Sequence, residues 1–144
     1  MTQSSAKRSL ASLNSRKASE TPYKFELLEA DGSASGVIVH VIGGQSRTVA
    51  DETNRLVNER RRQEAIRAAD APANRPGDAI TPVEDDIAFG QRLAAVRLVG
   101  WEGIEEAFSP AGALELCQIN PDYAAQITTQ SNRLANFISA SPKA

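Results

Sequence analysis

Three prolines in the second half of the chain each follow a residue type that commonly caps a helix: Thr81-Pro82, Ser109-Pro110 and Asn120-Pro121. Proline suits the first turn of a helix because it has no backbone N–H to leave unpaired there. Thr, Ser and Asn side chains accept hydrogen bonds from the N–H groups that remain. The three pairs therefore predict three helix starts and a helical unit over residues 82–140.

The first of these helices carries two apolar stripes, which predict that it is largely buried. We expect it to run to Gly100, with Trp101 in a turn that also contains Gly103. The acidic residues after Pro82 lie where the helix dipole favours negative charge. The stripes consist of Ile87, Ala94 and Leu98, and of Phe89, Leu93 and Val96.

Two strand-like segments precede this unit. Residues 23–29 alternate apolar and polar side chains, and residues 37–42 are rich in β-branched residues. The Asp31-Gly32 pair between them is a strong turn signal, so the two segments predict a β-hairpin. Ser46 or Thr48 is then placed to cap a helix over residues 49–69, whose second half is polar on all sides and should project into solvent.

The chain divides into four parts on this basis. Residues 1–21 are rich in Ser, Ala, Lys and Arg and predict a disordered arm, or one that a partner orders. Residues 22–70 hold the hairpin and its helix, and residues 71–81 form a Pro- and Gly-containing linker. The helical domain follows over residues 82–140. The fold class is α+β, mostly α.

Composition argues against several kinds of site. The chain of 144 residues has one cysteine and one histidine, so an intrachain disulfide is impossible and a zinc site lacks ligands. His40 and Cys117 are interpreted as structural residues. Neither a metal nor a cofactor is expected, and an enzyme is the least favoured class. No apolar run is long enough to cross a bilayer, and the start lacks the apolar core of a signal peptide.

The most basic run is Arg60-Arg61-Arg62. It could contact nucleic acid or an acidic protein surface. Consecutive helical residues point in different directions, and Glu59 and Glu64 weaken the local field, so a solvated helix face is the favoured interpretation. The formal net charge of -2 also disfavours nucleic-acid binding.

An ordered set of motifs runs through the last two-fifths of the chain. A helix that ends in Gly100-Trp101 is followed by Glu102-Gly103-Ile104, by the helix start at Phe108-Ser109, and by the break at Asn120-Pro121. The terminal Ala135-Asn136-Phe137 closes the series. In this order the motifs resemble small tail-region proteins of tailed bacteriophages, described as tail assembly chaperones or minor tail proteins.

That resemblance implies protein binding without catalysis. The expected partners are the tape-measure and tail-tube proteins, with a homo-oligomer also possible, and the expected location is the host bacterial cytoplasm during assembly. The alternative is a structural virion component: a minor tail, head–tail junction or capsid-decorating protein. The candidate partner-binding residues are Trp101, Ile104, Phe108, Arg60, Arg61 and Arg62. Trp101 is the leading anchor candidate, because Trp is enriched at binding hot spots. The alternative interpretation, which is equally favoured, is that Trp101 fills the core where the helices meet.

Overall fold

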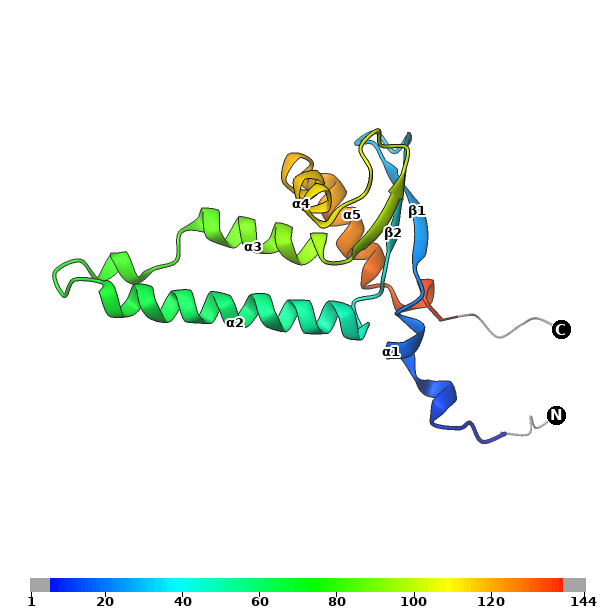
Figure 1. The fold of residues 1–144 in the computed structure, drawn as a ribbon, viewed down its shortest axis with the longest axis horizontal. Coiled ribbons are helices and arrows are strands. Elements are labelled where there is room, and N and C mark those ends of the chain that lie inside the picture. Colours follow the sequence, from blue (N-terminus) through cyan, green and yellow to red (C-terminus); the bar gives the residue numbers. More distant parts are fainter. Residues whose placement is uncertain (1–5, 139–144) are drawn as a thin grey trace.

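The computed structural model describes residues 6–138 and shows an α+β fold that is mostly helical, as the sequence predicts. Helices α4 and α5 lie beside a small antiparallel sheet, and α2 and α3 run side by side away from it (Figure 1). The 3₁₀ helices are labelled η. The elements are η1 (Ala11–Leu13), α1 (Ser15–Ala18), β1 (Tyr23–Leu28), β2 (Ala34–Val41), α2 (Arg47–Asp70), η2 (Pro76–Ala79), α3 (Val83–Ala95), β3 (Leu98–Glu102), α4 (Pro110–Ile119), α5 (Pro121–Ser131) and η3 (Leu134–Asn136).

The sheet contains a strand that the sequence did not predict. The hairpin of β1 and β2 is present as expected, but β3 pairs with the other edge of β2, giving the order β1-β2-β3. The helix expected to reach Gly100 ends at Ala95, and Trp101 lies in β3 rather than in a turn. A strand from the second half of the chain therefore completes the sheet begun in the first half.

An irregularity in the pairing of β2 with β3 turns two large side chains of β3 toward the core. Val41 pairs with Leu98, and Val39 pairs with Trp101, with a register shift between His40 and Val41. Strand side chains normally alternate between faces. The shift allows Leu98 and Trp101, three residues apart, both to pack with the core.

The hydrophobic core lies between the inner face of the sheet and α3, α4 and α5. Alternate residues of the strands point into it, and aromatic residues pack around its margin. Its buried members are Leu27, Val39, Val41, Ala94, Leu98, Ala113, Cys117 and Ile127.

Two of the three Pro-marked helix starts have the predicted caps. The Ser109 hydroxyl accepts a hydrogen bond from the N–H of Gly112, and the Asn120 side chain accepts one from the N–H of Tyr123. Ser46 likewise caps α2 through the N–H of Val49. The prediction for α3 was wrong: Pro82 itself occupies the N-cap position, and no side chain caps this helix.

Residues 1–21 are the arm that we expected to be disordered or ordered by a partner, and the end of this arm is packed on the body. Residues 1–5 lie outside the described part. Ser15–Ala18 form α1, and the Ser19 side chain is buried. The N–H of Gly43 donates to the carbonyl of Ser19 at 2.8 Å, and a Cβ on Gly43 would collide with the Ser19 side chain. The small size of both residues therefore lets the arm approach the end of the sheet.

Candidate partner-binding surface

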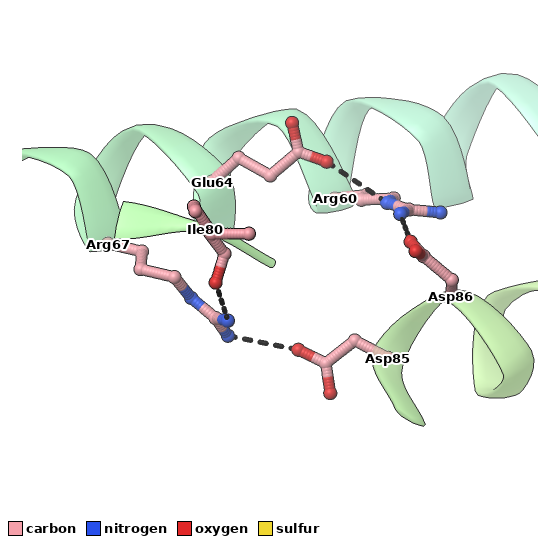
Figure 2. Close-up of polar contacts among 6 residues, drawn as sticks. All are labelled: Arg60, Glu64, Arg67, Ile80, Asp85 and Asp86. Carbon is pink, nitrogen blue, oxygen red and sulfur yellow. Dashed lines mark hydrogen bonds and ion pairs between the residues drawn. The ribbon is translucent and has the colours of Figure 1, made fainter. Parts of the chain in front are cut away.

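Helices α2 and α3 form a two-helix arm whose facing surfaces are held together mainly by charged groups (Figure 2). The 24 residues of α2 give a helix about 36 Å long. Arg67 contacts Asp85 at 2.9 Å, Arg92 contacts Glu59 at 3.6 Å, and Arg60 contacts Asp86. Arg67 also donates to the carbonyl of Ile80 at 3.3 Å. The only buried side chains of α2 are Val49 and Leu56, in its first half, which is the half attached to the body.

Arg60 contacts both an aromatic ring of α3 and a carboxylate of its own helix. Its Cζ lies 4.6 Å from the centre of the Phe89 ring, and its Nε is 3.0 Å from the Glu64 carboxylate. A guanidinium over an aromatic face is attracted by the negative face of the ring. Around these groups the two helices enclose a small, half-open cavity of about 160 Å³. Its lining mixes cations and carboxylates, so it is a structural gap in an ionic interface.

In contrast to this ionic interface, the side of α3 that faces away from α2, together with Ile80 just before the helix, exposes large apolar side chains. Ile80, Val83 and Ile87 have 71%, 68% and 56% of their surfaces exposed. Val83 and Ile87 lie four residues apart and so share one helix face. Ile87 also shares its face with Ala94, seven residues further on, which is 2% exposed and belongs to the core. The apolar face of α3 is thus covered by the body at one end and uncovered along the arm.

Ile80, Val83 and Ile87, which we call the arm face, form an unusual surface. Buried apolar contacts and exposed charges are the normal arrangement for a pair of helices. Here the ion pairs point inward and the branched apolar side chains point outward. Exposed apolar surface rimmed by polar residues commonly marks a protein-binding site.

The three consecutive arginines separate as their helical spacing predicts. Arg60 faces α3 and is engaged there, whereas Arg61 and Arg62 are exposed and make no ion pair within residues 6–138. They do not form a common basic stripe. Arg61 and Arg62 remain available to an acidic partner.

The candidates around the indole pack largely into the body. Trp101 is half-buried and meets Phe108 edge-on, with ring centres 5.1 Å apart. Its Nε1–H donates to the carbonyl of Glu106 at 2.9 Å. A Cβ on Gly112 would press against the indole, so α4 lies directly on the ring. Ile104 is half-buried in the connection between β3 and α4. Most of this cluster therefore serves packing, and only its outer rim faces solvent.

His40 lies in a polar cluster on the outer face of the sheet. Its Nε2 is 2.8 Å from Glu102, and Lys24 lies 3.8 Å from the same carboxylate. The hydrogen bond from His40, and then the charge of Lys24, lower the pKa of Glu102. The three residues come from three neighbouring strands, so the cluster joins the strands across the sheet.

Cys117 is fully buried in the core, and burial raises the pKa of its thiol to about 11. A buried thiol of this kind is a poor nucleophile because its reactive thiolate form is scarce. No group of three or more His, Cys, Asp or Glu residues within residues 6–138 is arranged to hold a metal ion. The acidic residues Asp85 and Asp86 are paired with arginines of α2.

Comparisons with protein-family models, with curated proteins and with solved structures found no match to this chain. Among the helices that the structure describes, none has the length and apolar character needed to cross a membrane.

Sequence reasoning missed the arm face. The periodicity of Ile87 with Ala94 predicted a buried face, which is correct only near the sheet. The exposed part could have been located from what precedes α3. The linker before Val83 contains two prolines and a glycine, so it supplies no long helix to cover the first turns of α3. Periodicity identifies an apolar face but not the residues that cover it.

Proposed function

We propose that this protein is a non-catalytic assembly factor that binds other proteins through the arm face, as a tail assembly chaperone of a tailed bacteriophage. The observation that carries the proposal is the reversal of polarity in the arm. Val83 and Ile87 on α3, and Ile80 just before it, are exposed, while Arg60 and Arg67 are paired with Asp86 and Asp85 between the helices. The resemblance of the motifs from Gly100-Trp101 to Phe137 supports the more specific context of tail assembly.

The arm face suits an amphipathic helix of a partner. Val83 and Ile87 are four residues apart in α3, the spacing with which helices pack on one another, and Ile80 adds a third branched side chain just before the helix. Complete burial of one such side chain stabilises a complex by about 1.5–3 kcal/mol. Three of them supply about 4.5–9 kcal/mol before the cost of association is subtracted. Micromolar binding needs a net free energy of about 8 kcal/mol, so polar contacts around the arm face must contribute the rest.

A capture experiment tests the proposal. The purified full-length chain is immobilised and offered the tape-measure protein and the tail-tube protein from the same phage, each separately. We expect saturable binding of at least one of them with a Kd at or below roughly the micromolar range. An absence of binding to both at tens of micromolar would overturn the proposal.

A second measurement distinguishes an assembly factor from the alternative, a structural virion component. An assembly factor leaves the particle, whereas a minor tail, head–tail junction or capsid-decorating protein remains in it. Mass spectrometry of purified virions should therefore detect the tube protein but not this chain. Stoichiometric recovery of this chain from virions would favour the structural role.

A further inference from the structure

The two ends of the sheet carry surfaces of opposite charge, each with exposed apolar side chains. At one end lies the N-terminal segment, residues 6–18. At the other end a groove opens between α5 and the end of β1. From these two surfaces we infer that copies of this chain associate head to tail, with the N-terminal segment of one copy in the groove of the next.

The N-terminal segment is basic and apolar. Residues 6–18 contain four basic residues (Lys7, Arg8, Arg16 and Lys17) and no acidic one. Leu10 and Leu13 are 87% and 52% exposed, so residues 6–138 of the same chain leave more than half of each uncovered. Yet the segment is fixed at its base, where Ser19 is buried and Asn14 caps α1 through the N–H of Lys17. A positioned segment with two exposed leucines loses less entropy on binding than a disordered one.

The groove is acidic and apolar. Its volume is about 390 Å³, and Phe25, Leu28 and Ala125 supply apolar surface, with Leu28 46% exposed. Three carboxylates surround it, those of Glu26, Glu29 and Asp122, and no Lys or Arg is among the residues that line it. Within residues 6–138 none of these carboxylates is in an ion pair.

The carboxylates are held in place by neutral groups. Glu29 accepts a hydrogen bond from the Tyr123 hydroxyl at 2.7 Å, and Glu26 accepts one from the N–H of Gly36 at 2.9 Å. Asp122 accepts one from Gln126 at 2.9 Å. Because these hydrogen-bond donors are uncharged, the three carboxylates have no cationic partner within residues 6–138. Their fixed positions favour a cationic ligand of matching geometry.

The occupant must come from another copy. The groove lies where β1 ends, whereas α1 precedes its beginning, so the two surfaces are at opposite ends of the sheet (Figure 1). The six residues of β1 span about 20 Å. Leu10, the farther of the two leucines, lies five residues before α1 and reaches at most about 18 Å from it, which is less than the length of β1. A contact of this kind uses different surfaces on the two copies, and therefore builds a ring or an open chain of subunits.

The two exposed leucines favour a protein groove over a phosphate backbone as the ligand of the segment, because phosphates offer nothing to apolar side chains. The small interface predicts weak association that depends on concentration. Because opposite charges contribute, added salt should weaken it.

The test uses the full chain and two variants that each disable one surface. Leu10→Asp with Leu13→Asp removes the apolar contacts of the segment, and Ala125→Arg fills the groove with a cation. All three positions are exposed, so circular dichroism should show unchanged folding. Ile119→Asp, at an exposed isoleucine outside both surfaces, is the control.

Sedimentation velocity should show that the average mass of the wild type and of Ile119→Asp rises above 15.4 kDa with concentration at low salt and returns toward it at high salt. Each single-surface variant should associate at least about tenfold more weakly. A mixture of the two variants should form a one-to-one dimer and nothing larger, because each supplies the surface the other lacks.

Three results would overturn the inference. The wild type could remain monomeric at every concentration and salt, the variants could associate as the wild type does, or the mixture could fail to dimerise. Salt-sensitive binding of the segment to double-stranded DNA by a chain that stays monomeric would overturn it as well, in favour of a phosphate ligand.

Discussion

The guanidinium of Arg60 in α2 lies over the ring of Phe89 in α3, with its Cζ 4.6 Å from the ring centre. The same guanidinium contacts Asp86, one turn earlier in α3. This one side chain thus supplies both a cation–π contact and an ion pair between two helices that bury little apolar surface together. The stability of the arm should therefore depend on Arg60 more than on its neighbours.

Replacing Arg60 with Ala should loosen the arm. We expect a loss of about 1 kcal/mol from the combined ring and carboxylate contacts, and thus roughly fivefold faster amide exchange in the first turns of α3. Hydrogen exchange followed by mass spectrometry measures this directly. Arg61→Ala is the matched control, because Arg61 is exposed and has no ion pair within residues 6–138. Equal exchange in the two variants would refute the role of Arg60.

Gly103 should tolerate a side chain far less well than Gly32. Both have left-handed backbone conformations, with φ of 85° and 86°. A Cβ at Gly103 would also collide with the carbonyl oxygen of Gly36, whereas one at Gly32 meets nothing. Gly103→Ala should lower the free energy of unfolding by about 3 kcal/mol and Gly32→Ala by about 1 kcal/mol. Urea unfolding of both variants checks this, and similar midpoints would contradict the close packing of β2 against the turn after β3.

The sequence predicted elements whose signals are local. The capping pairs Ser109-Pro110 and Asn120-Pro121 located α4 and α5, because cap and proline act within one turn. Alternation and the Asp31-Gly32 turn located the hairpin. In contrast, β3 is a short strand interrupted by Gly100, and its conformation depends on pairing with β2, which lies far away in sequence.

The candidate site was predicted only in part, for the same reason. Arg60 was identified as notable, but its partner Asp86 is 26 residues away and no local pattern connects them. Trp101 was identified from its rarity, yet its packing on Phe108 and α4 depends on how the chain folds back. The exposure of Ile80, Val83 and Ile87 depends on where the other elements of the fold lie, because none of those within residues 6–138 packs over these side chains.

The His40–Glu102–Lys24 cluster predicts a specific pH dependence. The pKa of Glu102 is lowered from its usual 4.5 in the folded protein. The stability it contributes is therefore present above that value and lost as the pH falls through the lower, folded-state pKa. Wild type should melt at a higher temperature than Glu102→Gln at pH 7, and the difference should disappear once the pH is below the folded-state pKa of Glu102. A difference in melting temperature that is constant with pH would contradict the contribution of this cluster to stability.

Cys117 should be almost unreactive in the folded protein. It is fully buried, and the pKa of its thiol is raised to about 11, so little thiolate exists at pH 8. A chromogenic disulfide reagent should label it at the rate of unfolding and rapidly in denaturant. Fast labelling of the native chain would contradict the packing of α4 in the core.

The most direct test of the central claim is calorimetric titration of the partner that binds in the capture experiment, the tape-measure or the tail-tube protein, into three forms of the full chain. The first is the wild type, the second carries Ile80→Glu, and the third carries Ile119→Glu as a control, since these isoleucines are 71% and 73% exposed. If the arm face binds the partner, Ile80→Glu should weaken binding at least about tenfold while Ile119→Glu binds as the wild type does. Equal binding by all three forms would contradict the assignment of the arm face.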